Sequence, residues 1–145
     1  DIVHSWGVLH HTGDMRLAIA NAAGLVKPGG HLVIALYNRH WTSRAWLAIK
    51  FAYCKSSPFM QRLFIRALYP IIYLAKAIVT GANPRQQLRG MDFYFDVVDW
   101  VGGYPYEYAS EAEVTSMIRP MGFSRVKFNA SQVPTGCNEF IFARR

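Results

Sequence analysis

Two neighbouring histidines, His10 and His11, are the side chains best suited to acid–base chemistry near the start of the chain. An imidazole gains or loses a proton near neutral pH, so either ring could act as a general base. On a helix, consecutive residues point about 100° apart, and only one of the two rings could then face a cleft. The sequence favours His10, with His11 as the second candidate. The alternative is that both only supply polar groups where a helix begins.

A second candidate group is the segment Tyr104-Pro-Tyr-Glu-Tyr108, which combines aromatic rings with one carboxylate. Glu107 could bind an amine or hydroxyl of a substrate, or serve as a base. Tyr104 and Tyr106 would then contact the substrate. The alternative is a packed aromatic loop in which Glu107 pairs with an arginine, and the residues leave both interpretations open.

The first thirty-eight residues predict the elements that would position the histidines. Residues 1–6 form a short extended run, residues 7–14 turn the chain, and residues 15–26 carry apolar side chains at helical spacing. Lys27-Pro-Gly-Gly30 ends that helix, and the apolar run 31–37 is typical of a parallel strand covered on both faces. Together they predict a right-handed strand–helix–strand unit of an α/β sheet.

The C-terminal region predicts further elements of the same sheet. After a short aromatic helix over 93–101, Ser110 and Glu113 form a capping box that begins a helix over 111–121. Two alternating strands follow, over 123–130 and 138–143, joined by a loop that contains residues 134–136.

The segment between these regions is basic and helical. No acidic residue lies between Asp14 and Asp92, whereas that interval holds eleven lysines and arginines. Helices are predicted over 41–53 and 59–79, with a kink or break at Pro70. Three cations interrupt the second helix within an arc of about 80°, which argues against a membrane span and for a helix on an anionic membrane surface or over a substrate. They are Arg62, Arg66 and Lys76.

Composition narrows the class of protein. The net charge of +7 fits an anionic partner, and charge alone does not separate phospholipid from nucleic acid. The two cysteines, Cys54 and Cys137, lie far apart without metal-ligand spacing, so we expect neither a disulfide scaffold nor a metal site. This predicts a cytoplasmic protein. The basic helices add the prediction that it binds at the periphery of a membrane.

The sequence resembles a known enzyme family. The stretches D-I-V-x-S-x-G-V-L-H-H and A-x-x-L-V-K-P-G-G-x-L-V-I are similar to the fourth and fifth strands of class I, Rossmann-like S-adenosylmethionine-dependent methyltransferases. The similarity is strongest to the small-molecule branch that includes the quinone-biosynthesis methylases. The segments G-G-Y-P-Y-E-Y-A-S-E-A-E-V and G-C-N-E-F-I-F resemble the end of one subgroup. The resemblance covers 1–38 and 91–145, as a partial methyltransferase core, and leaves 39–90 as a variable insertion.

This resemblance implies a fold, a cofactor and a site. The fold would be α/β, the C-terminal part of a Rossmann-like sheet with an antiparallel last strand, and the cofactor S-adenosylmethionine. Ligands of such sheets lie outside the carboxyl ends of the strands. The backbone of His4, Ser5, Trp6 and Gly7 would line the methionine part of the cofactor. Leu9 and His10 would border the donor methyl group, and Tyr37 and Asn38 would face the substrate. The alternative is that Ser5, Trp6 and Gly7 only turn the chain.

The resemblance also implies that a portion of the enzyme precedes Asp1. The family's Gly-rich turn and acidic ribose ligand come before its fourth strand, so we expect a fragment that is inactive in isolation. The expected activity is methyl transfer to a small, hydrophobic or lipid-like acceptor. One alternative is a membrane-surface binding module without catalysis. Another is a nucleic-acid methyltransferase, which is disfavoured because His4-Ser-Trp-Gly7 stands where base-modifying branches carry an Asn/Asp-Pro-Pro-Tyr motif.

Overall fold

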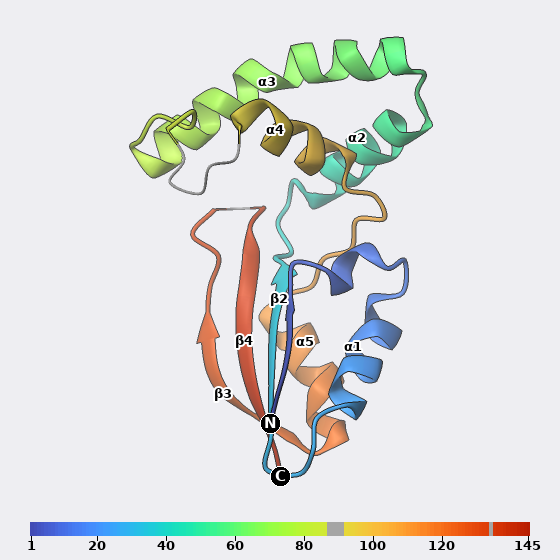
Figure 1. Cartoon of the computed structure of the whole chain (residues 1–145), viewed down its shortest axis with the longest axis vertical. Coiled ribbons are helices and arrows are strands. Elements are labelled where there is room, and N and C mark those ends of the chain that lie inside the picture. The colour runs from blue at the N-terminus through green and yellow to red at the C-terminus, as the bar shows by residue number, and fades with distance from the viewer. Residues whose placement is uncertain (87–91, 134) are drawn as a thin grey trace. The chain divides into compact units, whose positions relative to one another are not determined.

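The computed structural model describes residues 1–86, 92–133 and 135–145 (Figure 1). The chain forms two compact units. We call Asp1–Arg44 with Pro105–Arg145 the sheet unit, and Ala45–Tyr104 the helical unit. The predicted end of the insertion, at residues 90 and 91, lies outside the described residues. The predicted roles of core and insertion stay a prediction.

The sheet unit contains four strands in the order β1-β2-β4-β3. They are β1 (Ile2–Trp6), β2 (His31–Tyr37), β3 (Phe123–Asn129) and β4 (Cys137–Arg144). β1 and β2 are parallel, and β4 runs antiparallel to both of its neighbours. This confirms the predicted α/β fold with an antiparallel last strand, consistent with part of a Rossmann-like methyltransferase.

The connection between β1 and β2 follows the predicted strand–helix–strand unit. The helix α1 (Met15–Gly24) begins at Asp14, whose carboxylate accepts a hydrogen bond from the Leu17 amide. The turn after α1 is tight, because a Cβ at Gly30 would lie 2.7 Å from the Asp1 carbonyl oxygen. The guanidinium of Arg144 donates to the Val26 carbonyl just beyond α1, where a cation suits the negative end of the helix dipole. Local sequence and the last strand therefore fix this crossover together.

One face of the sheet carries the core of this unit. α1 lies beside α5 (Glu111–Ile118) on that face (Figure 1). Fully buried side chains of β2, β4 and the two helices meet there, among them Ile19, Leu32, Ile34, Val114, Phe140 and Phe142. On the other face Val33 and Ile141 stay partly exposed. The described residues of this unit therefore cover one face of β2 fully, whereas the sequence predicted cover on both.

Two short 3-10 helices complete the sheet unit. η1 (Leu9–His11) follows β1, and η2 (Arg119–Met121) follows α5. The predicted helix over 111–121 therefore changes its winding at Arg119. Pro120 explains this end, because proline has no amide proton for an α-helical hydrogen bond.

The helical unit contains α2 (Ser43–Lys55) from Ala45 onward, α3 (Pro58–Thr80) and α4 (Phe93–Gly102). α3 is a single helix that runs through Pro70, where the sequence predicted a kink or break. The core of this unit is formed by one face of α3 and one of α4, with Ile65, Phe93, Val97 and Val101 buried. By length and composition alone α3 could cross a membrane, so its three cations do not by themselves exclude a span.

A lysine, Lys50 of α2, is fully buried in the helical unit. Its ammonium donates a hydrogen bond to the Trp100 carbonyl and lies 4.4 Å from the centre of the Trp100 ring. Burial lowers the pKa of Lys50 from 10.5 to about 8, because the charged form loses hydration. At a pH between about 8 and 10.5, the lysine is mostly protonated in the unfolded chain and mostly neutral in the folded chain.

We expect Lys50→Met to be more stable than the wild type below pH 8, by on the order of 2 kcal/mol. The advantage should shrink as the pH rises from about 8 to 10.5, since the wild-type lysine then no longer carries a buried charge. Urea unfolding followed by tryptophan fluorescence measures this, because Trp46 and Trp100 pack together at 4.2 Å between ring centres. A difference that does not change with pH would contradict the prediction.

Candidate functional site

The carboxyl ends of β1 and β2 lie side by side, and the predicted site residues follow from them. Gly7 continues the pairing one residue beyond β1, since its amide donates to the Ala35 carbonyl at 3.2 Å. Gly7 has φ +73°, a conformation that side chains with a Cβ rarely adopt, and a Cβ built there would meet nothing within 4 Å. The glycine therefore serves the turn into η1 and leaves open space beside the strand end.

His10 is buried, and its ring is fixed by the backbone of β2. Its Nδ1 accepts a hydrogen bond from the Tyr37 amide at 3.3 Å, and the His10 and Tyr37 rings are 4.0 Å apart. A backbone amide can only donate, so Nδ1 carries no proton and the neutral ring carries it on Nε2. Both nitrogens are then assigned, and His10 has no lone pair left for a substrate proton. The hydrogen bond of His10 therefore joins η1 to the end of β2.

His11 has the opposite tautomer. Its Nδ1 lies 2.6 Å from the Pro105 carbonyl oxygen, and a carbonyl can only accept, so Nδ1 carries the proton. The neutral ring therefore has its lone pair on Nε2, and the residue is only partly buried. This geometry favours His11 over His10 as a general base, the reverse of the order that the sequence favoured.

Glu107 binds the start of α1. Its Oε2 accepts from the Gly13 amide at 3.1 Å, and its Oε1 accepts from the Met15 amide at 3.0 Å. The Glu107 amide in turn donates to the His10 carbonyl at 3.0 Å. The partners among the described contacts are thus backbone groups, in place of the arginine that the sequence offered as the alternative. Both carboxylate oxygens are engaged, so Glu107 fits a positioning role better than that of a base.

The predicted substrate residues separate into two groups. In the sheet unit, the Tyr37 ring lies 5.1 Å from Tyr106 and packs edge-on to His11 at 5.5 Å. Burial raises the pKa of Tyr106, so its phenol stays protonated at neutral pH. The Asn38 side chain accepts from the Asn138 amide group at 3.0 Å, which ties it to β4. Tyr104 belongs to the helical unit, where its ring contacts Phe51 at 5.5 Å.

The predicted cofactor residues lie along β1 and into η1. His4 and Trp6 are exposed on the same side of the strand and stack with 5.6 Å between ring centres. Ser5 points to the opposite side and is partly buried, and Leu9 packs against the core. A shallow depression of about 670 Å³ lies elsewhere on the sheet unit, between the ends of β3 and β4, and none of the predicted site residues lines it.

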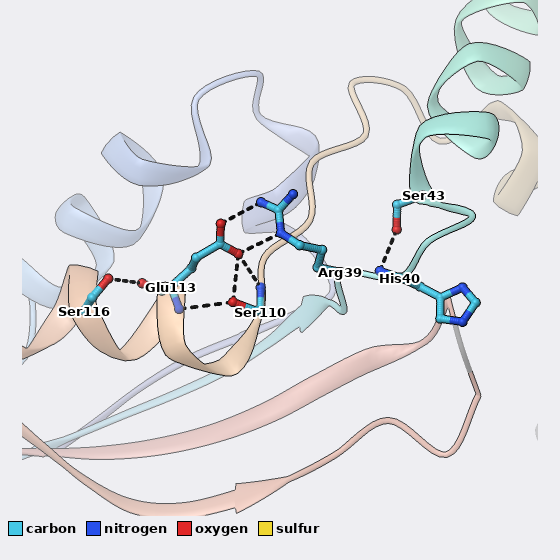
Figure 2. A network of polar contacts seen from close by, with 6 residues as sticks. All are labelled: Arg39, His40, Ser43, Ser110, Glu113 and Ser116. Atoms are coloured by element: carbon cyan, nitrogen blue, oxygen red, sulfur yellow. Dashed lines mark hydrogen bonds and ion pairs between the residues drawn. The ribbon is translucent and has the colours of Figure 1, made fainter.

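Sequence reasoning missed a charged network that fixes the end of β2 (Figure 2). The guanidinium of Arg39 donates two hydrogen bonds to the Glu113 carboxylate, at 2.8 and 2.7 Å. The same carboxylate accepts from the Ser110 amide at 2.7 Å and the Ser110 hydroxyl at 2.9 Å. The capping box was a signal for Ser110 and Glu113, but nothing local pointed to Arg39, which lies 74 residues away from Glu113. Hydrogen bonds from Arg39 lower the pKa of Glu113 from 4.5 to about 2.

The order and direction of the four strands are consistent with part of a Rossmann-like methyltransferase. Residues 1–72 match a family model described as a methyltransferase domain. A stretch of 45 residues, 31% of this chain, is 42% identical to a ubiquinone biosynthesis O-methyltransferase of Rhodopseudomonas palustris (strain BisB18) and covers 18% of that protein. No solved structure gives a significant match. Residues 1–72 are therefore similar to a methyltransferase-domain family, which typically uses S-adenosylmethionine.

Replacing Glu113 by glutamine should lower the free energy of unfolding by about 1 kcal/mol at pH 7, because it removes a charged cap and a partly exposed ion pair. The folded-state pKa is depressed, so this contribution is complete above pH 4.5 and is lost as the pH falls toward about 2. Urea titrations of wild type and variant between pH 2 and 7 measure the difference.

Glu111→Gln is the matched control, since it removes the same charge and a partly exposed ion pair, with Arg125, from the same helical turn without touching the capping box. It should cost less than about 0.5 kcal/mol. Equal costs for the two variants would contradict the special position of Glu113.

Proposed function

We propose that this chain belongs to an enzyme that transfers a methyl group from S-adenosylmethionine to a small, apolar acceptor. The observation that carries the proposal is that β1 and β2, parallel strands of the matched methyltransferase domain, end side by side next to His11. Ligands of doubly wound sheets bind outside such strand ends. The cofactor's methionine part would lie along the backbone from His4 to Gly7, with Leu9 near the donor methyl group.

The chemistry we propose is an in-line displacement in which the protein aligns donor and acceptor. Nε2 of His11 would take the proton of an acceptor hydroxyl, and S-adenosylmethionine held at the strand ends would supply the methyl group to the acceptor oxygen and leave as the neutral thioether. The hydrogen bond from Nδ1 of His11 to the Pro105 carbonyl favours this, because it fixes the orientation of the ring and leaves the lone pair on Nε2. Tyr37, Asn38 and Tyr106 would border the acceptor.

The class of methyl acceptor that we propose is based on the similar O-methyltransferase of Rhodopseudomonas palustris. That protein is an O-methyltransferase of ubiquinone biosynthesis, and we propose a hydroxylated aromatic acceptor with an apolar substituent for this chain as well. Such a substrate is small, lacks phosphate and fits the aromatic rings around Tyr37. The enzyme would be cytoplasmic and would reach lipid-like substrates from a membrane surface.

We further propose that the complete enzyme supplies the Gly-rich half of the cofactor site, so that residues 1–145 alone have little or no activity. β1 is an edge of the described sheet, and neighbouring apolar side chains are exposed. Ile2 is 69% exposed, and on α1 Leu17 is 56% and Leu25 is 75% exposed. Another strand and helix packed along β1 would bury these groups, which supports a larger domain.

Gly7→Ala should weaken S-adenosylmethionine binding by the full-length enzyme at least tenfold, because a methyl group and a strained φ at the strand end disturb the backbone that approaches the cofactor. Isothermal titration calorimetry measures the dissociation constant. Gly29→Ala is the matched control: Gly29 also has a positive φ, and a Cβ there also meets nothing within 4 Å, but it lies at the opposite end of β2. Equal effects of both variants would refute the role of Gly7.

His11→Gln should lower kcat about 100-fold while the dissociation constant for S-adenosylmethionine changes less than twofold. The glutamine amide can still donate to the Pro105 carbonyl but cannot accept the proton. The assay follows methyl transfer from radiolabelled S-adenosylmethionine to short-chain catechols and hydroquinones. His10→Gln, in which the side-chain oxygen can accept from the Tyr37 amide, should keep kcat within about threefold. A larger loss for His10→Gln than for His11→Gln would overturn the assignment.

A further inference from the structure

The outward face of α3 is a continuous apolar surface. At 100° per residue, six side chains fall within an arc of about 80° along nearly the whole helix. We call them the apolar stripe: Met60, Leu63, Ala67, Ile71, Leu74 and Ile78. The five large members are between 43% and 81% exposed. A run of exposed large apolar residues of this kind marks an interaction surface.

The opposite face of α3 is already occupied by the helical unit itself. Ile65 is 3% exposed and packs with α4, and the Lys76 ammonium forms an ion pair with Asp96 of α4 at 2.8 Å. The same ammonium lies 5.3 Å from the centre of the Phe93 ring. The packing of α4 therefore does not use the apolar stripe. Of the three cations that the sequence placed within one arc of the helix, Lys76 is therefore neutralised within the protein.

The positive charges beside the apolar stripe indicate which kind of surface it binds. Arg62 and Arg66 are exposed on α3 and project to the same side of the stripe, Arg66 about 60° and Arg62 about 100° from Leu63. Their long side chains can lie along an apolar surface and keep the guanidinium at its polar boundary. The helical unit has no acidic residue before Asp92, and Asp92 itself caps α4. An apolar stripe with cations at its margin fits an anionic phospholipid surface.

We propose that α3 lies in the surface of an anionic membrane, with the apolar stripe in the acyl region and with Arg62 and Arg66 at the phosphates. The helix is long enough to cross a bilayer, but crossing would bring Arg66 and the Lys76–Asp96 pair into the hydrocarbon and would separate α3 from α4. Lying in the surface keeps all of these contacts. The membrane surface is an interaction beyond methyl transfer, and its test does not depend on activity.

The experiment is co-sedimentation of the full-length protein with vesicles of 30% phosphatidylglycerol and 70% phosphatidylcholine, compared with pure phosphatidylcholine. We expect at least tenfold tighter binding to the anionic vesicles at low salt, because each cation near the surface contributes about a fivefold gain. Leu74→Ser with Ile78→Ser should weaken binding at least tenfold. Val126→Ser, which removes a 60% exposed apolar side chain from β3, should change it less than twofold.

The charge assignment has its own matched pair of variants. Arg62→Gln with Arg66→Gln should remove most of the preference for anionic vesicles. Lys76→Gln with Asp96→Asn, which replaces the ion pair by neutral groups, should leave that preference unchanged within about twofold. Circular dichroism of each variant confirms that α3 is still helical.

Four results would overturn the proposal. The first is a lack of binding to anionic vesicles at low salt, and the second is binding that the Leu74→Ser and Ile78→Ser changes do not weaken. The third is a self-association, seen by analytical ultracentrifugation, that these changes abolish while vesicle binding persists, since the stripe would then join copies of the chain. The fourth is resistance to extraction by alkaline carbonate, which would indicate that α3 crosses the bilayer.

Discussion

The carboxylate of Glu107 joins two segments of the sheet unit that are 92 residues apart or more. Its oxygens accept from the amide of Gly13, just before α1, and from the amide of Met15, the first residue of α1, which has no partner inside the helix. A negative charge at this end also suits the helix dipole. Because Pro105 precedes Glu107 by two residues, the same interaction brings the Pro105 carbonyl to His11. The tautomer of His11 therefore depends on a carboxylate whose two oxygens bind backbone amides.

The Arg39–Glu113 pair acts on the second strand in the same way. The chain leaves the sheet unit after Arg44 and returns at Pro105, with the helical unit between. Near these two points, backbone hydrogen bonds join the outgoing and the returning segments. The Ala109 amide donates to the Tyr37 carbonyl at 3.0 Å, and the Arg39 amide donates to the Ala109 carbonyl at 3.2 Å. The ion pair reinforces this junction from the side chains. A long segment between these two points is tolerated because both of its ends are fixed before the helical unit begins.

Much of the fold was predictable because its signals are local. The spacing of apolar residues predicted α1 and β2, and Ser110 with Glu113 predicted the start of α5. The site was less predictable, because the proton positions of His10 and His11 are set by Tyr37 and Pro105, which are far away in the sequence. The motif located the histidines but favoured His10, whereas the hydrogen bonds in the structure favour His11 as a base. Likewise, no local pattern indicated that Arg39 would bind Glu113.

α3 shows a second limit of periodicity. Its apolar residues occur around most of the helix, so spacing identifies which side chains share a face but not which face packs inward. Lys76 settles this in the structure: its pairing with Asp96 turns the face with Ile65 toward α4 and leaves the face with Leu74 outward. In water, about 25 cal/mol is lost for each Å² of apolar surface that stays exposed, so the large side chains of the outward face weigh against a free helix. An apolar environment on that side removes the cost without disturbing any contact that the helical unit makes.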